Sequence, residues 1–138
     1  MRNLICTLAV AILINGCGAT TPATPIQEKP MNSSATLLPQ RSVDVAPGTI
    51  LRYDGAADSR CPPDVRCITA GEIRYQFTLT GAAGAETFGL SKAAPAFDAA
   101  TYKGVRITLG QTTEPPLRPS TAAKPVLTTP VTVTVTRL

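Results

Sequence analysis

The sequence predicts an all-β fold: an antiparallel β-sandwich of six or seven short strands, immunoglobulin-like in outline, over residues 41–138. Apolar and polar residues alternate with a period of two through most of this region, which is typical of strands with one buried face. All six aromatic residues lie between Tyr53 and Tyr102, so we expect the packed core there. No segment after the first seventeen residues has helical spacing long enough to predict more than a short turn of helix, at 92–100.

The individual strands are predicted from local alternation. The clearest is 72–80, where Ile73, Tyr75, Phe77 and Leu79 share one face and polar residues share the other. The further predicted strands are 42–45, 49–53, 86–90, 105–109 and 131–136. Gly81 to Gly84 is predicted to form a hairpin loop. The stretch 114–130 contains five prolines and is therefore predicted to be a loop, because proline is excluded from central strands.

The first residues have the pattern of an export signal. Arg2 supplies a positive charge, and 4–14 is an apolar run of eleven residues, too short for a permanent transmembrane helix. The run ends in Ile14-Asn15-Gly16-Cys17, which resembles the lipobox at which bacterial lipoproteins are lipidated on cysteine and cleaved.

The lipobox resemblance implies where the chain resides. Residues 1–16 would be a lipoprotein signal peptide, and Cys17 would carry acyl chains that anchor the protein to a membrane of the cell envelope. Gly18 is not the Asp that retains many lipoproteins at the inner membrane, which favours the outer membrane. The alternative is ordinary secretion with cleavage after Ala19. Residues 17–40 are rich in Thr, Pro, Ala and Ser and are predicted to be a flexible tether.

Cys61 and Cys67, with five residues between them, are predicted to form a disulfide, as expected in an exported protein. In the chain-entropy model so short a loop stabilises the fold by about 2.4 kcal/mol. Metal ligation and redox catalysis are the alternatives. Both normally use a Cys-x-x-Cys pair or histidine partners, which this sequence lacks.

The stretch around these cysteines, Asp58-Ser-Arg-Cys-Pro-Pro-Asp-Val-Arg-Cys67 followed by Ala-Gly-Glu72, carries a family resemblance. It is similar to a D-S-R-C-P-x-x-V-x-C signature of small bacterial lipoproteins and secreted proteins that have no assigned activity. Thr69 stands where Trp is frequent in those sequences. The resemblance implies a β fold and a disulfide, and it implies no mechanism.

Charge and composition narrow the chemistry. The net charge of +4 is scattered, without the clustered basic residues of a nucleic-acid site. The chain has no histidine, the usual general base and metal ligand, so we predict no catalytic residues, no metal and no cofactor. Ser59 has no histidine to activate it. Four acidic residues alternate with four arginines and are predicted to form surface ion pairs, with calcium binding as the alternative: Asp54, Asp58, Asp64 and Glu72 with Arg52, Arg60, Arg66 and Arg74.

These observations predict a non-enzymatic envelope protein, a binding or structural module whose loops contact another envelope component. The candidate binding residues are those of the cysteine loop, namely Arg60, Pro62, Pro63, Asp64 and Arg66. The alternative is a periplasmic or surface protease inhibitor that presents the Cys61–Cys67 loop as preorganised backbone. The predicted partners are the membrane, through the lipid anchor, and another envelope protein, and no nucleic acid is expected.

Overall fold

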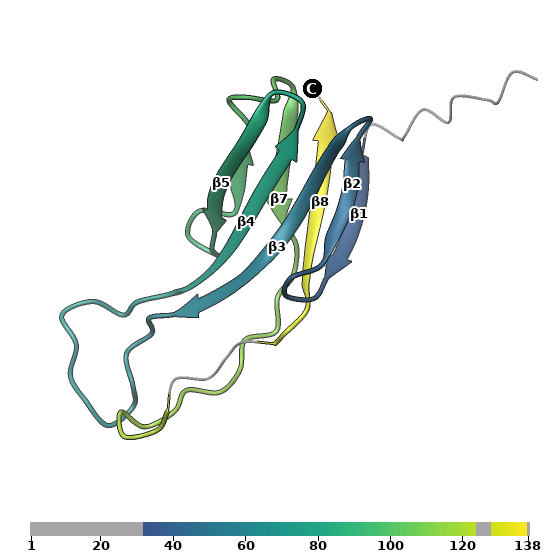
Figure 1. Cartoon of the computed structure of the whole chain (residues 1–138). Coiled ribbons are helices and arrows are strands. Elements are labelled where there is room, and N and C mark those ends of the chain that lie inside the picture. Colours follow the sequence, from purple (N-terminus) through teal and green to yellow (C-terminus); the bar gives the residue numbers. More distant parts are fainter. Residues whose placement is uncertain (1–31, 124–127, 138) are drawn as a thin grey trace, which may run out of the picture.

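The computed structural model describes residues 32–123 and 128–137. These residues form eight strands in two four-stranded antiparallel sheets that lie one over the other, so the predicted all-β sandwich is confirmed, with more strands than expected (Figure 1). The described residues contain no helix that is long and apolar enough to cross a membrane.

One sheet is a run of consecutive hairpins, and the other pairs the first described strand with the last. The first contains, in spatial order, β2 (Ser42–Ala46), β3 (Thr49–Asp58), β4 (Ile73–Gly81) and β5 (Gly84–Leu90). The second contains β1 (Asn32–Leu37), β8 (Val131–Arg137), β7 (Val105–Leu109) and β6 (Ala96–Asp98).

The strand order is up-and-down rather than immunoglobulin-like. Consecutive strands are paired within a sheet, except at two places where the chain crosses from one sheet to the other, between β1 and β2 and between β5 and β6. The first strand, β1, pairs with the last, β8. An immunoglobulin sandwich instead has Greek-key connections. The immunoglobulin outline expected from the sequence is therefore replaced by a simpler meander, because alternation predicts strands but not the order in which they pair.

Inward-facing side chains of both sheets form the core. Phe77 of β4 is fully buried and packs between Tyr53 and Phe88, with ring centroids 5.2 and 5.6 Å away. Phe88 also stacks on Phe97 of β6 at 3.9 Å and so links the edges of the two sheets. Fully burying one such side chain stabilises the fold by about 1.5–3 kcal/mol. The other buried hydrophobic residues are Leu37, Val45, Leu51, Ile73, Tyr75, Leu79, Leu90, Ala99, Val105, Ile107, Leu109, Val131, Val133 and Val135.

Strand β1 lies inside the segment predicted to be a tether, so the expected domain boundary at residue 41 is wrong. Asn32 pairs with Thr136 and Leu37 with Val131, and the chain then makes a tight turn in which the Arg41 amide donates to Leu38 O at 3.0 Å. The strand was missed because its inward-facing residues before Leu37 are small, so it shows no apolar alternation. The predicted signal peptide, Cys17 and the tether up to residue 31 lie outside the described residues.

The short turn of helix expected at 92–100 is also wrong. Three residues of this segment, Ala96–Asp98, form β6 and pair with Thr108 to Arg106 of β7. The strand is too short to show alternation, and the stack of Phe97 on Phe88 fixes it in the structure.

Candidate functional site

Strands β3 and β4 extend past their neighbours and lead into a projecting pair of loops. Arg52 is the last residue of β3 that pairs with β2, yet β3 continues to Asp58 and pairs only with β4 there. The loop that follows, 59–72, lies beside the first part of the β7–β8 connection, 110–123 (Figure 1). We call these two segments together the double loop.

The predicted disulfide is confirmed and closes the outer part of 59–72. Cys61 and Cys67 are bonded, with their Cα atoms 5.9 Å apart. The Cys61 amide donates to Ala70 O at 2.8 Å, so the chain leaves this loop beside the point where it enters. Covalent closure of a short loop limits the conformations open to it before any partner arrives.

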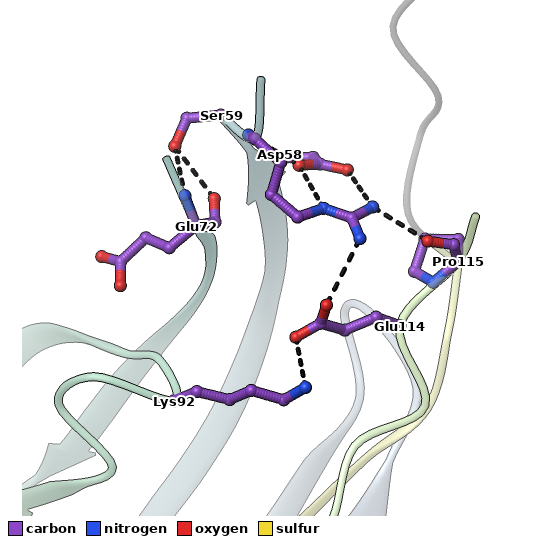
Figure 2. Close-up of polar contacts among 7 residues, drawn as sticks. Asp58, Ser59, Glu72, Lys92, Glu114 and Pro115 are labelled. Carbon is purple, nitrogen blue, oxygen red and sulfur yellow. Dashed lines mark hydrogen bonds and ion pairs between the residues drawn. The ribbon is translucent and has the colours of Figure 1, made fainter. Parts of the chain in front are cut away.

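Ser59 and Gly71 hold the base of the same loop. The Ser59 amide donates to Glu72 O at 2.9 Å, and its hydroxyl donates to the same oxygen at 2.9 Å while accepting from the Glu72 amide at 3.1 Å (Figure 2). Gly71 has φ of 68°, and a Cβ at this position would lie 1.9 Å from Ser59 O. Only glycine fits here. The Ser59 hydroxyl therefore helps to hold the two ends of the loop together.

Arg60 clamps the two segments of the double loop together. Its guanidinium donates to both carboxylate oxygens of Asp58, at 2.9 and 2.7 Å, in a bidentate pair. It also donates to Pro115 O at 2.9 Å and to Glu114 Oε2 at 3.3 Å (Figure 2). Lys92, which follows β5, reaches the other oxygen of Glu114 at 2.7 Å. Five donors in a fixed plane suit arginine to this role, and lysine lacks that geometry.

The electrostatics of this clamp favour its charged form. The side chains of Arg60 and Asp58 are only 15% and 18% exposed. Hydrogen bonding to the guanidinium lowers the pKa of the Asp58 carboxyl below its ordinary value and outweighs the opposing effect of burial. The same contact raises the pKa of Arg60. Breaking one partner of such a pair leaves a poorly solvated charge, which costs more than an exposed ion pair contributes.

A second contact joins the loops farther out. Asp64 accepts from the Ser120 amide at 2.8 Å and from its hydroxyl at 2.6 Å. These hydrogen bonds lower the pKa of the Asp64 carboxyl. Two residues 56 positions apart are thereby joined at the outer part of the double loop, so the two segments contact each other both at the Arg60 clamp and beyond it.

The outer surface of the double loop is apolar and basic. Three of the five exposed large hydrophobic side chains among the described residues lie on it: Val65 at 43%, Ile68 at 106% and Leu117 at 48% exposure. Arg66 and Arg118 are exposed beside them, and neither forms an ion pair with a described residue. Apolar side chains combined with arginine are typical of protein interfaces. We call these five residues the tip.

The residues predicted to bind a partner divide into two groups. Arg60 and Pro62 are half-buried, and the exposed Asp64 is bonded to Ser120, so these three residues support the loop. Pro63 and Arg66 are exposed. Sequence reasoning missed the apolar members of the tip. One signal in the sequence could have indicated them, namely an isolated Ile or Leu in a loop rich in proline and charged residues, outside any predicted strand.

The predicted ion pairs form in part. Arg52 pairs with Asp54 at 2.6 Å, and Arg60 with Asp58. Asp64 instead bonds to Ser120, and the Glu72 carboxylate points away from the clamp in Figure 2. No three Asp, Glu or Cys side chains in the described part of the chain gather as a metal site would require.

A small pocket lies between the two segments of the double loop. Its lining combines Asp58, Arg60 and Pro62 with the stretch Pro116–Ser120. Asp58 and Arg60 are already engaged with each other, so the pocket offers the Arg118 side chain, proline rings and the Leu117 side chain to a ligand. Comparisons with protein-family models, curated proteins and solved structures found no match to this chain. The geometry of the double loop is therefore the guide to function.

Proposed function

We propose that this chain is the precursor of a lipid-anchored protein of the bacterial cell envelope, a non-enzymatic binding module that docks on another envelope protein through the tip of its double loop. In this proposal Cys17 carries the anchor and the sandwich presents the double loop away from the membrane. The tip supplies apolar contact from Ile68 and Leu117, and Arg66 and Arg118 favour a partner surface with carboxylates at its rim.

The observation that carries this proposal is that the backbone of the double loop is fixed by specific contacts while its apolar side chains stay exposed. A disulfide, the Arg60 clamp and the Asp64–Ser120 contact fix a segment that buries little of its own apolar surface. A loop held in this way loses less conformational entropy when it binds, so more of the contact energy remains as affinity. An isolated Ile that is fully exposed on a braced loop supports docking rather than stability.

The proposal is tested by photo-crosslinking in intact bacterial cells. A photoreactive amino acid replaces Ile68 in the full chain, and the matched control carries it at Ile50, which is 44% exposed on the outer face of β3. We expect a discrete adduct from position 68 and none from position 50. The adduct should weaken when Arg118→Glu is added, because the basic residue contributes to the same surface.

Two results would contradict the docking proposal. Equal adducts from positions 68 and 50 would mean that crosslinking reports exposure alone. No adduct from position 68, nor from a second probe at Leu117, would mean that the tip has no partner in the envelope.

The anchor is tested separately by intact-mass analysis of the mature protein. We expect an N-terminus at Cys17 with the added mass of a diacylglyceryl group, and no acylated species from a Cys17→Ser variant. An unmodified chain that begins after Ala19 would show ordinary secretion and remove the lipid anchor, without affecting the docking test.

Protease inhibition is the second candidate function, and one observation favours it. Among the described residues, no backbone hydrogen bond is donated by the stretch 66–69, so its peptide groups are open to a protease. The test is inhibition of a panel of serine proteases by the purified full chain. Inhibition that is lost in Arg66→Ala and kept in Arg41→Ala would support this function, whereas the absence of inhibition across the panel would exclude it for those enzymes.

A further inference from the structure

A second pocket lies at the end of the sandwich opposite the double loop. It is open to solvent and lies between the β2–β3 turn, the β6–β7 connection and the end of β8, and its lining includes Pro47, Thr49, Lys103 and Arg137. Strand β3 begins at Thr49 and reaches the double loop after Asp58, a rise of roughly 30 Å at the spacing of a strand. The β2–β3 turn, which lines the pocket, and the double loop therefore lie at opposite ends of the molecule (Figure 1).

The pocket is cationic. Lys103 and Arg137 line it, and no acidic side chain does. Arg137 is positioned by one hydrogen bond to Val45 O at 3.2 Å, and neither cation forms an ion pair with a described residue. Two carboxylates on the neighbouring strands β5 and β6 are engaged elsewhere: Glu86 accepts from two backbone amides of the β6–β7 connection, and Asp98 pairs with Arg106 at 2.6 Å.

A hydroxyl completes the polar lining. Thr49 is only 6% exposed, yet it lines the pocket, and its hydroxyl has no hydrogen-bond partner among the described residues. This hydroxyl is not fully enclosed by protein atoms, in contrast to the hydroxyl of Tyr53. Two cations and a free hydroxyl around an open pocket match the oxygens of a phosphate group.

The position of the pocket indicates the source of that phosphate. Asn32, where β1 begins, pairs with Thr136, the residue before Arg137. The chain that leads from Cys17 therefore enters the sandwich at the end that carries the pocket. An anchor on Cys17 would bring this end, rather than the double loop, toward the bilayer.

We propose that this pocket binds the phosphate headgroup of an anionic phospholipid in the membrane that holds the anchor; the inference rests on the proposed lipid anchor for its choice of ligand. Contact between the pocket and the headgroups orients the sandwich so that the tip points away from the bilayer. A single flexible attachment leaves the domain free to tumble, whereas a second contact restricts it.

The test uses the full chain with Cys17→Ser, which attaches no acyl group. Binding is measured to vesicles of phosphatidylcholine alone and to vesicles with 30% phosphatidylglycerol, at about 0.05 M salt. We expect the anionic lipid to strengthen binding, and Lys103→Glu with Arg137→Glu to weaken it by at least about 30-fold, since each lost cation near an anionic surface is worth about fivefold and the new carboxylates add repulsion. The matched control, Arg41→Glu with Arg74→Glu, makes the same change in net charge away from the pocket.

Each outcome decides the inference. A loss specific to the pocket variant supports it, and equal losses in the two double variants overturn it, because net charge would then suffice. Equal binding to the two kinds of vesicle would also overturn it, whereas competition by 10 mM inorganic phosphate would support it, because the pocket would then recognise the phosphate group. If the double variant does not fold, as judged by its circular dichroism, Lys103→Glu alone is compared with Arg41→Glu. Since no anchor is present in this assay, its result is independent of the intact-mass test of Cys17.

Discussion

The body of the sandwich and the double loop are held together by different physics. Every buried hydrophobic residue in the described part of the chain belongs to the body, where Phe77 and its neighbours form one continuous core. The double loop has none of them and depends on the Cys61–Cys67 bond, the Arg60 clamp and the Asp64–Ser120 contact. Burial is non-directional and spread over many residues, whereas each of these three contacts has specific geometry.

The difference explains how one small domain is both stable and available for binding. The body excludes water and tolerates exchange of one apolar side chain for another of similar volume. The double loop keeps its apolar side chains exposed, because polar and covalent contacts fix its backbone without using them. Variants should therefore act on one region without the other, and the size of each effect should follow the kind of contact that is removed.

The largest expected effect is in the body. Phe77→Ala removes a fully buried ring between Tyr53 and Phe88 and should lower the free energy of unfolding by about 3–5 kcal/mol. Urea denaturation followed by circular dichroism measures this change. Ile50→Ala, on the exposed face of β3, is the control, with an expected change below about 1 kcal/mol. Similar losses in both variants would contradict the assignment of the core.

Removal of the disulfide should have a smaller effect that begins in the double loop. Cys61→Ala with Cys67→Ala should lower the free energy of unfolding by about 2.4 kcal/mol, the entropy of closing a short loop. Hydrogen exchange should show faster exchange of the amides in 59–72, while those of β4 stay protected. If amide exchange in β4 and in the loop accelerates equally, the loop does not open independently of the body, which would contradict the proposed division.

The Arg60 clamp should contribute a similar or slightly smaller amount. Arg60→Gln removes the positive charge that Asp58 and Glu114 contact, so two partly buried carboxylates lose a hydrogen-bond donor. This should lower the free energy of unfolding by about 1–3 kcal/mol. Arg60→Lys should recover only part of this, because an ammonium group cannot make the bidentate contact with Asp58. Full recovery by lysine in urea denaturation would show that charge, and not the planar fork, holds the loops together.

Acid should weaken the Arg60 clamp. The folded-state pKa of Asp58 is lowered, so its contribution to stability is complete above the unfolded pKa of about 3.9 and is lost as the pH falls through the folded value. Between pH 5 and pH 2 the wild-type chain should lose more stability than Asp58→Asn. Parallel pH profiles for the two chains would contradict the clamp.

The sequence predicted the body better than the double loop, for the same physical reason. In the body, the residues that are buried are those predicted from the alternation of apolar and polar residues, as in β4, β7 and β8. Strand β1 was missed because its inward residues are small, and β6 because it is short. Both are specified by their partners, β8 and β7, rather than by their own pattern.

The candidate site was predicted in outline only. The spacing of Cys61 and Cys67 was sufficient to predict their bond. That Arg60 reaches Glu114 depends on a fold that brings together residues 54 positions apart, and no local pattern indicates it. The exposure of Ile68 has the same cause, because a local sequence does not show which loops pack against a core and which project.

The most direct test of the double loop is the hydrogen exchange of one amide. The Ser120 N–H lies in the β7–β8 connection and donates to Asp64 of the other segment at 2.8 Å. We predict that this amide exchanges measurably more slowly than an unprotected peptide in the oxidised full chain, and that Asp64→Ala removes the protection while the amide of Ile107 in β7 keeps its own. Exchange of Ser120 at the unprotected rate in the wild-type chain would contradict the account, because the two segments would then not form one surface.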